Sequence, residues 1–215
     1  MAARFLLHHA PKSRSFGSLW LLEEAGAGYE LSWHSLEAAT NRTAEYLAVN
    51  PAGKLPALVD RGPEGDWNGV VVTEAAAIAA YVADALPEAR LAPPIGSPAR
   101  AAYAFWMAYA PGVMEPAMAD MAFPRAKPAP ARALGWPGFP DTVLRAEAAL
   151  TTGPWLVGNQ FTAADILLGG LLAWVVEWGM LQPGPVIARY LDAIEARPAR
   201  QAAIRKGAAP QRQAS

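Results

Sequence analysis

The sequence predicts an α/β domain followed by an all-helical domain. Short apolar runs of strand length alternate with helical patterns through the first 85 residues, whereas no convincing strand pattern follows residue 98. Between the two regions, residues 86–98 read LPEARLAPPIGSP, and their four prolines are typical of a linker. We therefore expect an α/β domain at 1–85, a linker at 86–98 and a helical domain at 99–215.

The first domain is predicted to alternate strands and helices. Phe16, Leu19 and Trp20 recur at helical spacing, which places a helix after the first apolar strand. The segment 61–68 is rich in Gly, Pro and Asp and separates the two strands of a hairpin. The expected elements are strand 3–9, a helix that ends at Gly26 or Gly28, strand 29–34, helix 40–48, strands 56–60 and 69–72, and helix 74–85. This β-α-β-α-β-β-α order predicts a thioredoxin-type sandwich, with parallel pairing at the start and a hairpin at the end.

The second domain is predicted to consist of helices joined by Pro-rich connections. The segment 99–122 has a helical pattern, but Pro111 and Pro116 must break or kink it. Five prolines make 123–140 a long irregular connection. Further helices are expected at about 141–152, 162–178 and 187–197, and the polar tail after about residue 206 is expected to fray.

The helix expected at 162–178 opens with a capping box. In this motif Thr162 accepts a hydrogen bond from the N–H of Asp165, the Asp165 carboxylate reaches back to the backbone of residue 162, and Phe161 packs on Ile166. Because the motif starts a helix, we assign Asp165 a role in folding and no chemistry.

The bulk composition excludes several classes of function. With 53% hydrophobic and 17% charged residues the chain is globular, and its net charge of −1 provides no field for nucleic acid or anionic membranes. The apolar run near the N-terminus is too short for a signal peptide, and the longest one, 166–176, is too short to span a bilayer. We therefore expect a cytoplasmic protein.

Cysteine is absent from the sequence, which excludes disulfides, thiolate metal sites and redox chemistry on a protein thiol. His8 and His9 are adjacent on the first expected strand and point to opposite faces, so together with His34 they predict no metal site. Any thiol chemistry must use a sulfur that arrives with a cofactor.

Two segments combine features that suit a small anionic peptide. Residues 50–58 read NPAGKLPAL, in which Pro56 enters a strand and leaves the backbone beside Leu55 unpaired on one side. Residues 72–83 read VTEAAAIAAYVA, in which a helix starts near Glu74 directly after a strand. Such a start directs N–H groups and the positive end of the helix dipole outward. An extended peptide can therefore bond the strand-entry backbone while its carboxylate meets the helix start.

In this order and spacing, the two segments resemble the soluble glutathione S-transferase family, which has a cis proline at strand entry and an acidic-Ser pair at the next helix. The resemblance covers nearly the whole chain and implies a C2 homodimer that binds glutathione as co-substrate, without a metal. It implies that Leu55 bonds the cysteinyl main chain of glutathione, that Pro56 shapes the turn and that Glu74 faces the γ-glutamyl amine. Residue 75 would face the γ-glutamyl carboxylate, and here the chain departs from the family by having Ala75 in place of Ser.

A glutathione transferase must stabilise the thiolate of glutathione, and a hydrogen-bond donor near a helix N-terminus does so. The segment Ser13-Arg14-Ser15-Phe16, with the run from Leu19 to Glu24, resembles bacterial serine-type members that are theta- or beta-like. The match is best at Ser13, which we predict to be the catalytic donor. Ser15 is the alternative, and Arg14 is a further donor in the cofactor site. The other role open to Ser13 is that of a plain helix N-cap.

The resemblance also implies a hydrophobic electrophile site between the domains. The residues expected to line it share one helical face, and the alternative for each is the core: Tyr103, Trp106, Met107 and Ala110. Trp136 and Phe139, in the Pro-rich connection, are candidates for a lid. Arg42 and Lys54 are candidates to face the glycyl carboxylate of glutathione.

These features predict a transferase that conjugates glutathione to hydrophobic electrophiles, and three alternatives stay open. Ala75 favours a non-catalytic protein that binds apolar ligands on the same fold. A glutathione-dependent isomerase is a second alternative, although such relatives usually carry a cysteine beside the active serine. A glutathione peroxidase activity is the third, because a poised thiolate also attacks peroxides.

Overall fold

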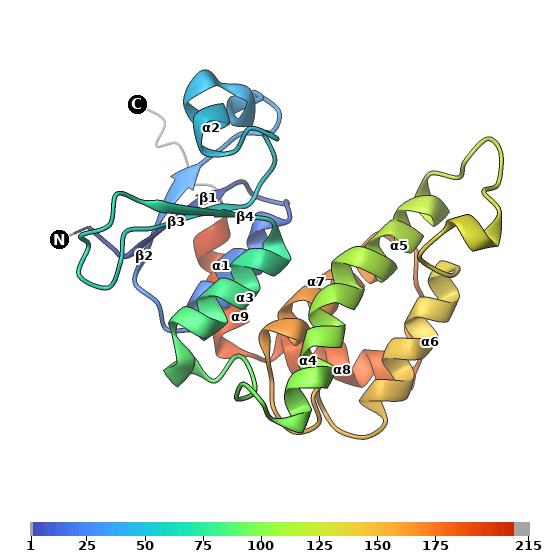
Figure 1. The fold of residues 1–215 in the computed structure, drawn as a ribbon. Helices are drawn as coiled ribbons and strands as arrows, with labels where there is room; N and C mark the ends of the chain where they lie inside the picture. The colour runs from blue at the N-terminus through green and yellow to red at the C-terminus, as the bar shows by residue number, and fades with distance from the viewer. Residues whose placement is uncertain (1, 209–215) are drawn as a thin grey trace. The chain divides into compact units, whose positions relative to one another are not determined.

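The structure is a computed structural model that describes residues 2–208. The chain forms two compact units (Figure 1). The first comprises Met1–Ala89 together with Arg197–Ser215, and the second comprises Arg90–Ala196. Within the described range, no helix is long and apolar enough to cross a membrane.

A four-stranded mixed sheet forms the centre of the first unit. Its strands are β1 (Phe5–His9), β2 (Tyr29–Trp33), β3 (Ala57–Asp60) and β4 (Val70–Thr73), in the spatial order β2-β1-β3-β4. β1 pairs with β2 in parallel, while the β1–β3 and β3–β4 pairs are antiparallel. A parallel neighbour requires a crossover and an antiparallel one allows a hairpin, so the predicted thioredoxin-like order is confirmed.

Helices cover this sheet. They are α1 (Ser15–Glu24), α2 (Ala44–Val49) after the short turn η1 (Thr40–Arg42), and α3 (Ala75–Ala85) followed by η2 (Pro87–Ala89). Figure 1 shows α1 and α3 on one face of the sheet and α2 beyond the other. Four successive apolar residues of α1, from Leu19 to Leu22, are buried, so this helix belongs to the core on more than one side.

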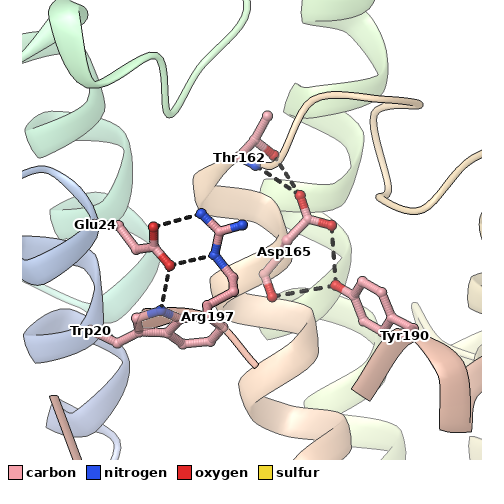
Figure 2. Close-up of polar contacts among 6 residues, drawn as sticks. All are labelled: Trp20, Glu24, Thr162, Asp165, Tyr190 and Arg197. Carbon is pink, nitrogen blue, oxygen red and sulfur yellow. Dashed lines mark hydrogen bonds and ion pairs between the residues drawn. The ribbon is translucent and has the colours of Figure 1, made fainter. Parts of the chain in front are cut away.

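The far end of the chain adds a further helix to the first unit. α9 (Pro198–Gly207) packs against α1, and the ion pairs Arg197–Glu24 and Lys206–Glu23 join the two segments. Figure 2 shows Glu24 accepting hydrogen bonds from both Trp20 and Arg197. The predicted boundary assigned this segment to the helical domain, whereas its partners lie on α1 and group it with the first unit. The tail expected to fray falls largely outside the described residues.

The second unit consists of helices. They are α4 (Pro98–Tyr109), α5 (Glu115–Ala122), α6 (Phe139–Leu150), α7 (Ala163–Glu177) and α8 (Pro185–Glu195), with the short turns η3 (Ala110–Met114) and η4 (Ala131–Ala133). The break expected at Pro111 is the π-helical turn η3 between α4 and α5. Proline produces it because it has no N–H to donate to the preceding turn.

The N-terminus of α7 has the predicted capping box (Figure 2). The Asp165 carboxylate accepts hydrogen bonds from the Thr162 N–H at 2.9 Å, the Thr162 hydroxyl at 3.1 Å, the Tyr190 hydroxyl at 3.1 Å and the Leu156 N–H at 2.9 Å. Burial raises the pKa of Asp165 to about 6, and the hydrogen bonds oppose that rise. These partners hold α7, α8 and the preceding loop together, which is the folding role expected of Asp165.

Candidate functional site

The three residues predicted to act on a thiol lie in the connection from β1 to α1 and at the first position of α1. Ser13 is half-buried, Arg14 is exposed, and Ser15 is fully buried with 0% of its surface accessible. The Ser13 hydroxyl lies 2.8 Å from the carbonyl oxygen of Ala10 and 2.7 Å from Ser15 Oγ. Of the two serines, therefore, only Ser13 presents a surface that a ligand can reach.

The first turn of α1 holds Ser13 in place. Arg14 occupies the N-cap position of α1, so Ser13 lies one residue before the N-cap. The carbonyl of Ser13 accepts the N–H of Phe16 at 3.0 Å, and its hydroxyl oxygen accepts the N–H of Ser15 at 3.3 Å. The Ser13 hydroxyl thus lies beside the positive end of the α1 dipole, where a developing negative charge is stabilised.

His9 is a site residue that the sequence reasoning missed. Its ring is 1% exposed, with Nδ1 lying 2.8 Å from Ser15 Oγ and Nε2 lying 3.1 Å from the carbonyl oxygen of Gly207. A carbonyl can only accept, so Nε2 carries the hydrogen, and in the neutral ring Nδ1 is then an acceptor for the Ser15 hydroxyl. Burial lowers the pKa of His9 and so favours this neutral form.

A glycine allows α9 to approach His9 this closely. A Cβ on Gly207 would stand 2.9 Å from Leu19 Cδ2 and 3.2 Å from His9 Nε2. Any larger residue would push the C-terminal end of α9 away from β1. The signal for this contact is absent from the local sequence, because the two partners are 198 residues apart.

The neighbouring His8 points away from this site, as the strand alternation predicts. Its Nδ1 lies 3.0 Å from His34 Nε2, and both rings pack against Tyr46. Burial, helped by the charge of His34, lowers the pKa of His8 to about 4. Among residues 2–208, His, Cys, Asp and Glu side chains form no group of three that could hold a metal.

The second part of the candidate site is the corner before β3. The Leu55–Pro56 peptide bond is cis. The carbonyl of Lys54 accepts from the Tyr46 hydroxyl at 2.5 Å and from the Asn50 side chain at 2.8 Å, which fixes the backbone that leads into Leu55. Leu55 itself is half-buried and the Lys54 side chain is exposed. The corner therefore holds a rigid main chain beside an accessible cation.

Arg42 lies behind the same corner. Its guanidinium donates to the carbonyl of Ala52 at 3.1 Å, and a Cβ on Gly53 would stand 2.6 Å from its Nη1. Through these contacts, Arg42 stabilises the turn 50–53.

The start of α3 is the third part. Glu74 is exposed and has φ +68° and ψ +126°, a backbone conformation that costs a non-glycine residue energy and is concentrated at functional sites. The first intrahelical bond joins the Ile78 N–H to the Glu74 carbonyl at 2.9 Å. The N–H groups of Ala75, Ala76 and Ala77 therefore precede the helical ladder and point out of its N-terminus.

The residues predicted to line an electrophile pocket lie on α4 and at the start of η3. All are at most 9% exposed: Tyr103, Trp106, Met107 and Ala110. Trp106 packs edge-on against Phe105 and Tyr109. Their role as a pocket remains a prediction. Trp136 and Phe139 line an open hollow of the second unit, where the Trp136 indole N–H donates to Asp120 at 3.0 Å.

Both halves of the chain match known domains. Residues 4–84 match the glutathione S-transferase N-terminal domain, and residues 105–198 match the glutathione S-transferase C-terminal domain. A crystal structure of a glutathione transferase from Methylococcus capsulatus is 30% identical, with a TM-score of 0.76 over 94% of this chain and 98% of that one. This chain belongs to the glutathione S-transferase family.

Two further glutathione S-transferases are similar along nearly their whole length. Glutathione S-transferase GstA of Escherichia coli O157:H7 is 26% identical, over 92% of this chain and 96% of the relative. A sphingomonad glutathione S-transferase complexed with glutathione is 28% identical, with a TM-score of 0.72 over 95% of this chain and all of that one. The expected family membership is thus confirmed.

Proposed function

We propose that this glutathione S-transferase conjugates glutathione to hydrophobic electrophiles, with the Ser13 hydroxyl as the donor to the thiolate. The observation that carries the proposal is the accessibility of Ser13 beside the α1 N-terminus, while Ser15 is enclosed. A free thiol has a pKa of about 8.5, so a donor and a helix dipole at the sulfur are what the reaction requires. Arg14, exposed beside Ser13, is a further donor to the cofactor.

The rest of glutathione would bind at the corner before β3 and at the α3 N-terminus. Leu55 would offer its main chain to the cysteinyl unit, Pro56 would shape the turn, and Lys54 would face the glycyl carboxylate. Glu74 would face the γ-glutamyl amine, and the N–H groups that begin at Ala75 would receive the γ-glutamyl carboxylate. A sphingomonad relative holds glutathione, which supports this cofactor for the present chain.

The electrophile would meet an apolar face of α4 and the start of η3, formed by Tyr103, Trp106, Met107 and Ala110. We propose in addition that the active form is a cytoplasmic homodimer. Membership of the glutathione S-transferase family supports both statements.

Titration calorimetry and turnover of Ser13→Ala test the proposal. Glutathione and its thiol-free analogue glutathione sulfonate should both bind the wild type in the micromolar to low millimolar range. Ser13→Ala should lower turnover by about tenfold or more, the equivalent of one hydrogen bond to a charged group, with little change in glutathione affinity. An unchanged rate would refute Ser13 as the donor and move that role to Arg14, because Ser15 is enclosed.

One observation favours a second function. The missing hydroxyl at Ala75 removes one contact to the γ-glutamyl carboxylate, and a non-catalytic protein that binds apolar ligands on this fold would tolerate that loss. Failure of both glutathione and glutathione sulfonate to bind would support this second function over the transferase.

A further inference from the structure

A continuous hydrogen-bonded chain runs from the accessible Ser13 to the interior of the first unit. Ser13 Oγ lies 2.7 Å from Ser15 Oγ, Ser15 Oγ lies 2.8 Å from His9 Nδ1, and His9 Nε2 lies 3.1 Å from the Gly207 carbonyl oxygen. Ser15 and His9 are 0% and 1% exposed, so water does not compete for these bonds. These hydrogen bonds therefore join the hydroxyl of the half-buried Ser13 to a buried base.

The hydrogens available on Ser13, Ser15 and His9 allow the hydrogen bonds between these residues to run in either of two donor-to-acceptor directions. Each hydroxyl has one hydrogen, and the His9 Nε2 hydrogen is committed to Gly207. With neutral His9, Ser15 donates to Nδ1 and accepts both from the Ala10 N–H and from Ser13, whose hydrogen can alternatively point to the Ala10 carbonyl oxygen 2.8 Å away. With protonated His9, Nδ1 donates to Ser15, Ser15 donates to Ser13, and the hydrogen of Ser13 turns toward the ligand. Both directions use the same oxygen and nitrogen positions.

We infer that His9 is the acceptor of the glutathione thiol proton, which reaches it through Ser13 and Ser15. The inference rests on the proposed function, because it needs a thiol next to Ser13. In the ground state the S–H donates to Ser13 Oγ. The S–H bond then breaks and leaves its electron pair on sulfur, while a new O–H bond forms on Ser13.

The original Ser13 hydrogen passes to Ser15, and the Ser15 hydrogen passes to His9 Nδ1. The products are a thiolate that accepts from Ser13 and an imidazolium that donates to Ser15 and Gly207. No atom is lost or gained, and the site keeps its net charge. His9 does not contact the sulfur in this scheme, so it acts as a positioning residue and a proton store.

The surroundings of His9 suit this task. Burial keeps the resting ring neutral, as an acceptor must be, and a thiolate nearby then favours the imidazolium. Arg205 of α9 is exposed, and several other charged groups on the neighbouring elements have partners of their own. Glu23 pairs with Lys206, Glu24 pairs with Arg197, Arg200 stacks over Phe16 and Trp20, and His8 bonds to His34. The ring nitrogens of His9 remain directed at Ser15 and Gly207.

Counting protons on glutathione binding tests the inference. Calorimetry near pH 7 in two buffers of different ionisation enthalpy gives the protons released, and ultraviolet absorbance gives the thiolate formed. S-methylglutathione, which has no ionisable thiol, supplies the background. The wild type should release well under one proton per thiolate, and His9→Asn should release one, since Asn keeps an acceptor beside Ser15 but cannot take the proton.

The possible outcomes separate the inference from the proposed function. One proton released per thiolate in the wild type would overturn the relay and leave the transferase intact. Glutathione bound without any thiolate would overturn both. If His9→Asn does not fold, Ser15→Ala replaces it, and this variant should also release one proton per thiolate. In the ¹⁵N-labelled wild type, the Nδ1 signal of His9 should move to the protonated range with glutathione and stay in place with S-methylglutathione, and an unmoved signal with glutathione would also refute the relay.

Discussion

Ala75 offers a direct test of how the α3 N-terminus holds glutathione. The residue is half-buried, is the first of α3, and has an N–H that precedes the Ile78–Glu74 bond, the first of the helical ladder. Ala75→Ser adds a hydroxyl beside these N–H groups. A hydrogen bond to a charged group contributes roughly 1.5–3 kcal/mol. We therefore expect the Kd for glutathione to fall by roughly 10- to 100-fold, at about tenfold per 1.4 kcal/mol.

Titration calorimetry of the two proteins with glutathione measures this change. Ala77→Ser is the matched control, because it puts the same side chain in the same first turn at an exposed position. The control should leave the Kd within about twofold of the wild type, as expected of a surface substitution. An equal gain in glutathione affinity in both variants would indicate a general effect of Ser on the helix. No gain at position 75 would mean that the backbone N–H groups already satisfy the carboxylate, and the argument from the missing hydroxyl would be refuted.

Two further predictions concern stability. Gly169→Ala brings a Cβ to 2.1 Å from Ile194 Cδ1 in the buried α7–α8 contact, whereas Gly170→Ala meets no atom within 4 Å. Overpacking lowers the free energy of unfolding by about 1–3 kcal/mol, whereas the higher helix propensity of Ala raises it by about 1 kcal/mol. Urea unfolding should therefore show Gly169→Ala to be less stable than Gly170→Ala. Equal changes in the two variants would contradict the packing described. The pKa of His8 is lowered from 6.5 to about 4, so the unfolded chain binds more protons between these values and stability falls as pH falls. The decrease in the free energy of unfolding attributable to His8 should reach roughly 3 kcal/mol near pH 4. His8→Gln should flatten that part of the pH profile measured by urea unfolding. Parallel profiles for the variant and the wild type would refute the assignment.

Several elements of both units were predictable because their signals are local. The i, i+3, i+4 recurrence of Phe16, Leu19 and Trp20 marked α1, and the Gly-rich segment 61–68 marked the hairpin. The capping box at Thr162 was predicted from four residues, and it forms as expected. Each of these patterns reports interactions within one element or across one turn, which sequence spacing encodes directly.

The C-terminal helix was not predicted, and the reason is equally physical. α9 has a largely polar sequence. Glu23 and Glu24, the partners of Lys206 and of the preceding Arg197, stand more than 170 residues earlier in the chain. Nothing in residues 198–207 indicates that these carboxylates face them. Its assignment to the first unit therefore depends on a packing that only the folded chain displays.

The sequence by itself determined the order of elements up to α8, the division into an α/β part and a helical part, the family resemblance and the short list of candidate residues, because each depends on local patterns and motifs. Tertiary structure decided which serine is accessible and which is enclosed, and it brought His9 between Ser15 and the end of α9. Burial and hydrogen-bond partners come from segments far apart in the chain, so no local pattern specifies them. The protonation chemistry proposed for this site depends on those partners.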